Sequence, residues 1–148
     1  MMPSELFIDH EKIVLTAEGK FLSNGEEISH QRTVEAFHRF LGHDLEGYFI
    51  KIGADFKRIE VEDTAYFVEA IDWKDDRLLL RISDGSTESL DPTTLRFSEP
   101  RLTCRIKDGK EEAKFLRVPY LEFFLHASEE GEGFTFRLGE KNFHLGSH

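Results

Sequence analysis

The sequence predicts an α+β fold made of two similar halves, each a hairpin, a helix and a second hairpin, with mainly antiparallel sheet. The first observation is an internal repeat: residues 46–53 (EGYFIKIG) return as residues 132–139 (EGFTFRLG), an offset of 86 positions. The second is that a helix-like apolar run precedes each copy, and an Asn-Gly or Asp-Gly turn signal precedes each run. The third is polar–apolar alternation, typical of strands, in the remaining segments.

The N-terminal half is expected to span residues 1–62. It begins with short strand-like runs and an Asn-Gly pair at residues 24–25, which suits a tight hairpin turn with positive φ. Ser29 is suited to the N-cap of a helix that runs to Leu41. Gly42 is suited to the left-handed residue that ends such a helix.

The C-terminal half, residues 63–148, is expected to open with an antiparallel meander. Turn signals separate three strand-like runs, 66–73, 78–82 and 87–90. The second helix is expected to begin near Pro119, because proline is tolerated at the first helical position, and to run to residue 127. The sequence leaves open whether the halves pack closely as two bodies or form one compact unit.

The composition argues against several classes of partner. The chain has 148 residues with 19 basic and 29 acidic side chains, a net charge of −10. Such a chain repels nucleic acid and anionic membranes at long range. The single cysteine, Cys104, excludes an intrachain disulfide and is expected to be a small buried hydrophobe. A start without signal-peptide character predicts a cytoplasmic protein.

The strongest candidate site is a local reversal of that charge. Residues 101–117 contain six basic and three acidic side chains. Arg105 and Lys107 share one face if this segment is a strand, and Arg117 follows at the entrance of the second helix. Such a cluster suits a phosphate or carboxylate. The alternative is a solvated strand face whose charges deter edge pairing.

Enzymatic chemistry has weaker support. Glu60, Glu62 and Asp63 could hold a divalent cation or perform acid–base work, which leaves a metal-dependent hydrolase as a remote alternative. Their other interpretation is an exposed strand face followed by a turn. No nucleophile elbow, phosphate-binding loop or zinc-protease motif is present. We therefore predict no catalytic residue, no metal and no cofactor.

Two segments carry a family resemblance. Residues 59–67 (IEVEDTAYF) and 113–122 (AKFLRVPYLE) resemble segments of the uncharacterised bacterial family DUF1285, a domain of unknown function. The resemblance implies a duplicated α+β architecture with a C-terminal half similar to pleckstrin-homology folds. It also implies a ligand pocket between the halves, for which nucleotide-based ligands are candidates, and a role in signalling. The matching positions are Glu62, Asp63, Arg117 and Tyr120.

Together these observations predict a non-enzymatic module that binds a small anion, nucleotides included, at the seam between the halves. In this hypothesis three basic residues contact phosphate, Tyr120 stacks or hydrogen-bonds, and two carboxylates orient the basic groups or accept from ribose hydroxyls. The basic residues are Arg105, Lys107 and Arg117, and the carboxylates are Glu62 and Asp63. The main alternative is a protein–protein interaction module that uses a sheet edge or an apolar patch.

Overall fold

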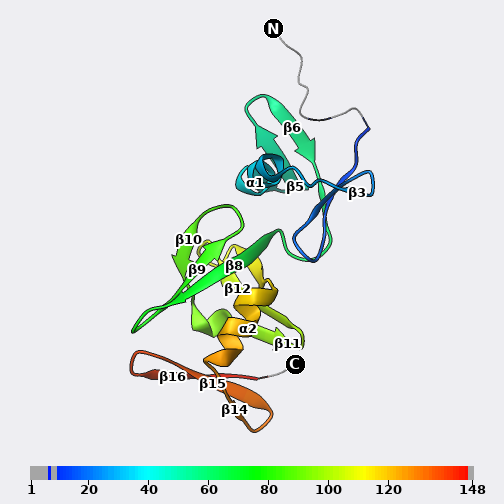
Figure 1. Cartoon of the computed structure of the whole chain (residues 1–148). Coiled ribbons are helices and arrows are strands. Elements are labelled where there is room, and N and C mark those ends of the chain that lie inside the picture. Colours follow the sequence, from blue (N-terminus) through cyan, green and yellow to red (C-terminus); the bar gives the residue numbers. More distant parts are fainter. Residues whose placement is uncertain (1–6, 8–9, 147–148) are drawn as a thin grey trace. The chain divides into compact units, whose positions relative to one another are not determined.

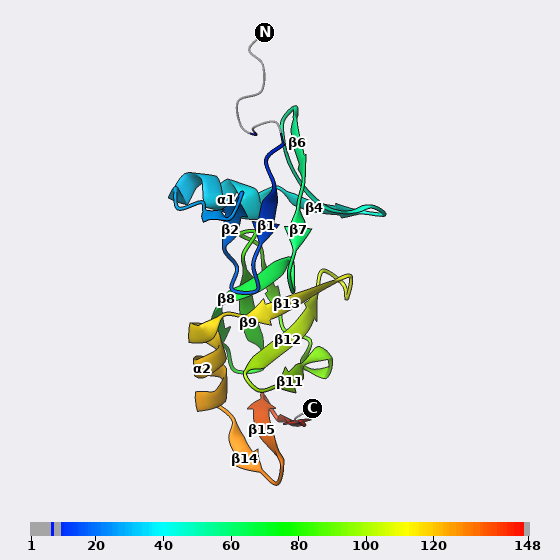
Figure 2. The ribbon, with the colours of Figure 1, turned by 90° about the vertical axis from the view of Figure 1, so that its right-hand side faces the viewer.

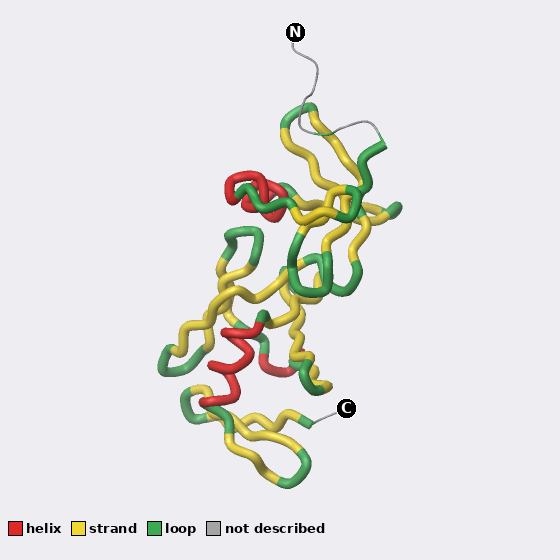
Figure 3. The backbone as a smooth tube through the Cα atoms, turned by 45° about the vertical axis from the view of Figure 1, so that its right-hand side comes forward, coloured by secondary structure: helices red, strands yellow, loops and turns green. Residues whose placement is uncertain are grey.

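The computed structural model describes residue 7 and residues 10–146, which form two compact units (Figure 1). The first unit ends at Ala65 and the second begins at Tyr66, three residues after the predicted boundary at 62/63. Strands dominate both units (Figure 3), and most of them pair antiparallel. The fold class is therefore α+β. Each unit is described by itself.

The first unit contains two small sheets and one helix. Its four-stranded sheet has the order β3-β2-β1-β7, with β1 and β7 parallel. The strands are β1 (Ile13–Leu15), β2 (Phe21–Ser23), β3 (Glu26–Glu27) and β7 (Glu60–Val61). Helix α1 (Gln31–Arg39) leads into an antiparallel meander of β4 (Leu41–Asp44), β5 (Gly47–Ile52) and β6 (Asp55–Arg58). Phe21 and Phe37 meet edge to face in the core, with ring centroids 5.4 Å apart.

The second unit is built on a six-stranded sheet with the order β10-β9-β8-β13-β12-β11. These strands are β8 (Tyr66–Trp73), β9 (Leu78–Ile82), β10 (Thr87–Ser89), β11 (Arg96–Ser98), β12 (Arg101–Ile106) and β13 (Glu111–Phe115), and a 3-10 turn (Pro92–Thr94) precedes β11. The central pair, β8 and β13, is parallel, and the other pairs are antiparallel. Helix α2 (Arg117–Leu125) packs against β8 and β13 (Figure 2). A second meander follows, with β14 (Ser128–Glu130), β15 (Gly133–Leu138) and β16 (Lys141–Leu145).

The two helix-and-meander segments share an offset of 86 residues in their helix bounds and in their strand register. Helix α1 begins and ends 86 residues before α2, and β5 stands in the same relation to β15. Cross-strand partners repeat with the same offset: Gly42 faces Phe49 as Ser128 faces Thr135. Each copy follows its helix with three strands, so the predicted second hairpin is instead a meander.

The Asn-Gly turn of the first unit is confirmed. Asn24 and Gly25 have φ values of 50° and 87°, and the flanking residues Ser23 and Glu26 pair across the hairpin. Two positive φ values in succession define the tight turn that matches the twist of a β-hairpin.

Three predictions at the helix ends are wrong. Helix α1 begins after His30, which provides no side-chain cap, so Ser29 is not the N-cap. The helix ends at Arg39, and Gly42 lies in β4. Position 42 requires glycine for a packing reason, because a Cβ there would lie 2.5 Å from the ring of Phe49 on the paired strand.

Helix α2 also differs from its predicted bounds. It begins at Arg117, two residues before Pro119, and ends at Leu125 rather than residue 127. Proline fits inside the first turn because the first N–H groups of a helix have no intrahelical acceptor. Within the described residues, no helix is long and apolar enough to cross a membrane.

Candidate functional site

The second unit contains a cleft of about 420 Å³, lined by residues of β11, α2 and the β14–β15 hairpin and of the segment after β11. Its lining has three kinds of residue: aromatic rings, carboxylates and glycines. They are Phe97, Tyr120, Phe124 and Phe134; Glu99, Glu129 and Glu132; and Gly131 and Gly133. The volume lies near the lower end of the range of small-molecule sites.

The aromatic rings of the cleft form one continuous cluster. Tyr120 and Phe124 lie one turn apart on α2, so both project from the same face of the helix. Phe124 lies 4.9 Å from Phe97 of β11 and 4.7 Å from Phe134 of β15, measured between ring centroids. Because each ring contacts at least one other, the wall of the cleft is held by packing among three elements.

The carboxylates of the cleft come from short connecting segments. Glu99 follows β11, Glu129 lies in β14, and Glu132 lies in the turn before β15. All three side chains are exposed. Burial and the negative charge of Glu99 raise the pKa of the Tyr120 hydroxyl above its ordinary value. The cleft therefore combines apolar ring surfaces with an acidic rim.

Lys107, predicted to contact phosphate, is bound within its own unit. It lies beyond the end of β12 with φ of 54°, so it is not on the strand face shared by Arg105. Its Nζ lies 2.7 Å from Oδ2 of Asp84 and 5.0 Å from the ring centroid of Tyr66. Burial opposes ionisation of Asp84, but hydrogen bonds from Lys107 and Ser86 outweigh it and lower the pKa of that carboxyl.

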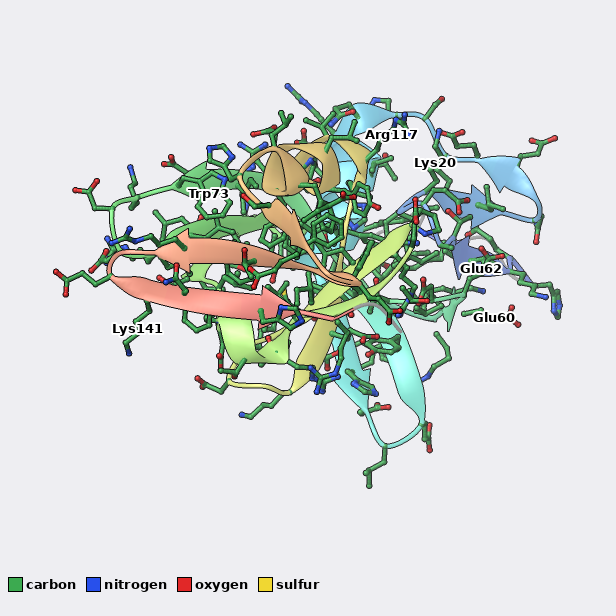
Figure 4. All side chains as sticks on the ribbon, turned by 90° about the horizontal axis from the view of Figure 1, so that it is seen from below. Lys20, Glu60, Glu62, Trp73, Arg117 and Lys141 are labelled. Atoms are coloured by element: carbon green, nitrogen blue, oxygen red, sulfur yellow. The ribbon has the colours of Figure 1, made fainter. Side chains whose placement is uncertain are left out.

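Arg105 and Arg117 have different surroundings. The guanidinium of Arg105 donates to the carbonyl oxygen of Gly109, at 2.9 Å from Nη2, and so braces the turn after β12. Arg117 is the first residue of α2 and is exposed (Figure 4). No side chain caps this helix. Among the described residues, no hydrogen bond or ion pair engages the Arg117 guanidinium, which leaves it available for an external anion.

Tyr120 belongs to the aromatic cleft. It contacts Phe97 and Phe124, whereas Lys107 contacts Asp84 and Tyr66, so Tyr120 and Lys107 lie in different side-chain clusters. Within the second unit, the predicted basic residues and Tyr120 do not form one constellation.

The predicted carboxylates belong to the first unit. Oε1 of Glu62 accepts a hydrogen bond of 3.0 Å from the backbone N–H of Ala17, and the N–H of Glu62 donates to Leu15. These contacts fasten the β1–β2 turn. Asp63 follows and is half-buried. Whether Glu62 and Asp63 also take part in ligand binding stays a prediction.

Cys104 is fully buried and has no disulfide partner, as the sequence predicts. Burial, with the nearby charges of Glu88 and Glu112, raises the pKa of its thiol to about 12, so the nucleophilic thiolate is strongly disfavoured. Across the described part of the chain, no group of three or more His, Cys, Asp or Glu side chains is placed to hold a metal ion.

Helix α2 also exposes an apolar stripe. Val118, Leu121 and Leu125 are 64%, 46% and 82% exposed, and they lie on one face at spacings of three and four residues. The residues 86 positions earlier in α1 are Arg32, Glu35 and Arg39, all exposed. The same face is therefore charged in one helix and apolar in the other.

Two solved structures similar to this chain come from the family that its motifs resemble. A DUF1285 family protein from Silicibacter pomeroyi DSS-3 aligns over 90% of this chain and 79% of its own, with a TM-score of 0.68 and 14% identity. A DUF1285 family protein from Shewanella baltica OS155 aligns over 80% of this chain and 94% of its own, with a TM-score of 0.59 and 16% identity. At these identities the likeness is one of fold, and the resemblance is confirmed at that level. No family model and no curated protein matches the chain.

Proposed function

We propose that this chain is a non-enzymatic module that binds a small anionic ligand, with nucleotides as the leading class, and that it serves in signalling. The observation that carries the proposal is the N-terminal end of α2, where an exposed Arg117 stands on an uncapped helix. Free backbone N–H groups and a guanidinium both favour an oxyanion.

Arg105 and Lys107, the other predicted phosphate contacts, would contribute less to anion binding. Arg105 and Lys107 already bond to Gly109 and Asp84, so an anion would have to compete with those contacts. Binding by these two residues would therefore add less than binding by Arg117. The participation of Glu62 and Asp63 belongs to the same proposal and is tested by their neutral amide variants.

A thermal-shift series with nucleotides, cyclic dinucleotides and inorganic phosphate tests the proposal. A ligand at a hundred times its dissociation constant adds about 2.7 kcal/mol of stability, which moves the unfolding midpoint by several degrees. We expect Arg117→Ala to abolish that shift without changing the midpoint of the free protein.

The matched control is Arg32→Ala, which removes an exposed arginine from the first turn of α1. An equal loss in both variants would indicate an effect of net charge rather than a site. The absence of a shift with every compound would contradict the proposal.

The apolar stripe of α2 favours a second candidate function, a protein–protein interaction module. A helix that exposes apolar side chains at this spacing offers a surface on which a partner protein can dock. The residues 86 positions earlier on α1 are charged, so the apolar face is a feature of α2 alone among these two helices. A saturable protein partner that binds equally well to Arg117→Ala would favour this function over the anion-binding one.

We also propose two features of the architecture. The shared offset of 86 residues in helix bounds and strand register supports an origin of the two halves by internal duplication. The helix that follows the antiparallel strands of the second unit supports a likeness to pleckstrin-homology folds. Comparison of the two segments by superposition, and of the second unit with pleckstrin-homology structures, tests them.

A further inference from the structure

The residues that line the cleft of the second unit do not suit an anion. Four aromatic rings supply apolar surface, three carboxylates supply negative charge, and its lining contains no Lys, Arg or His among the described residues. A bound anion would face like charges on Glu99, Glu129 and Glu132, whose repulsion grows as water is excluded. The cleft therefore needs a different class of ligand.

The negative charge of the cleft is not neutralised by neighbouring cations. Within residues 10–146, none of the three carboxylates forms an ion pair. The arginines on the bordering strands are directed to backbone acceptors instead: Arg96 donates to the carbonyl of Leu95 at 2.9 Å, and Arg137 donates to the carbonyl of Gly139 at 2.7 Å. The charge remains available to a ligand.

A metal ion fits the cleft poorly. Hard divalent cations require about six oxygen ligands that converge on one point. The described His, Cys, Asp and Glu side chains include no group of three placed that way. A neutral apolar molecule would fill the space between the rings but would gain nothing from the carboxylates.

We propose that this cleft binds a small organic cation of the alkylammonium class. The alkyl groups would contact the faces of Tyr120, Phe124 and Phe134, and the charge would face Glu99 and Glu132. Ammonium groups are attracted to ring faces within about 6 Å of the centroid, and carboxylates at the rim add Coulomb attraction, which needs no N–H donor. Arg117 does not line this cleft, so the cation-binding proposal can be tested independently of the anion-binding proposal.

The test is a nitrogen-15 NMR titration of the full chain with choline and, separately, with its uncharged isostere 3,3-dimethylbutan-1-ol. We expect saturable shifts of the Gly131 and Gly133 amides with choline, because both residues line the cleft. The neutral alcohol should bind at least about tenfold more weakly, since it lacks the cation–π attraction. Equal affinity for the two compounds, or no saturable shift, would overturn the proposal.

Charge-neutral variants then locate the site. Glu99→Gln combined with Glu132→Gln is expected to weaken choline binding about tenfold, because it removes the Coulomb attraction of two of the three carboxylates. Glu140→Gln removes an exposed carboxylate of the same unit that does not line the cleft, and it should leave binding unchanged. An equal effect of the two changes on choline affinity would mean that the affinity comes from the overall surface charge and not from this cleft. Arg117→Ala should not affect choline binding, which separates this outcome from that of the anion test.

Discussion

At the scale of single residues, glycine stands at equivalent positions of the two repeated segments for different reasons. Gly47 opens β5 with φ of 125°, a conformation that other residues rarely adopt, and has open space around it. Gly133, 86 positions later, opens β15 without that conformation, but a Cβ there would lie 2.5 Å from the carbonyl oxygen of Leu145. Glycine is therefore required for its backbone conformation at position 47 and for its lack of a side chain at position 133.

This difference predicts a clear cost for Gly133→Ala. The obstructing atom is a backbone oxygen, which cannot move aside as a flexible side chain would, so we expect a loss of about 1–3 kcal/mol in the free energy of unfolding, measured by urea denaturation. Gly146→Ala is the control, because no heavy atom lies within 4 Å of its Cβ position and its φ is not positive. A change at Gly133 no larger than at Gly146 would show that β15 and β16 adjust freely.

At the scale of elements, the two helices differ in the face they present. Replacing Val118, Leu121 and Leu125 by Arg, Glu and Arg would give α2 the exposed residues of α1. We expect the free energy of unfolding to change by no more than about 0.5 kcal/mol per site, because exposed side chains contribute little. Binding of any protein partner that docks on this stripe should be lost.

The contradicting outcome for the helix exchange is a large destabilisation of the free chain, measured by the same urea titration. It would mean that the stripe is covered within the chain itself and is not a docking surface. The control is Glu35→Leu, which makes the corresponding face of α1 more apolar and should likewise leave stability unchanged.

Elements with a strong local pattern were predictable from the sequence, and those that depend on pairing were not. Strands β8 and β9 have the predicted bounds, 66–73 and 78–82, because apolar runs between clear turn signals define them. Strands β4 and β14 were not predicted, because they are short and largely polar and exist through pairing with β5 and β15. The parallel pair of β8 and β13 joins residues about 47 positions apart, which no local pattern encodes.

Most residues of the candidate cleft could not be predicted from the sequence either. Of the six predicted site residues, Tyr120 is the one that lines it. Glu132 lies in a segment that is typical of a turn before a strand, and Phe134 begins the polar–apolar alternation of that strand, so neither pattern indicates a cleft. Only the fold brings β11, α2 and the β14–β15 hairpin together. The aromatic spacing on α2 was visible in the sequence, but its role as a cleft wall was not.

At the scale of the whole molecule, each compact unit contains a carboxyl group whose pKa is lowered by a basic partner. In the first unit, hydrogen bonds from Arg58 lower the pKa of Asp44. In the second unit, hydrogen bonds from Lys107 and Ser86 prevail over burial and lower the pKa of Asp84. Such groups stabilise the folded state above their unfolded pKa, about 3.9 for Asp, and this contribution is lost as pH falls through the lower folded pKa.

The two ion pairs therefore predict acid unfolding that can be assigned unit by unit. The single tryptophan, Trp73, lies at the end of β8 and reports on the second unit (Figure 4). We expect Lys107→Met to move the acid transition seen by tryptophan fluorescence to higher pH, because partly buried Asp84 then loses its cation and ionises less readily. Arg58→Met removes the corresponding pair in the first unit and should leave that transition in place. An equal displacement of the acid transition by both variants would show that the two units unfold together in one cooperative step. A displacement by Lys107→Met alone would show that the two compact units unfold independently.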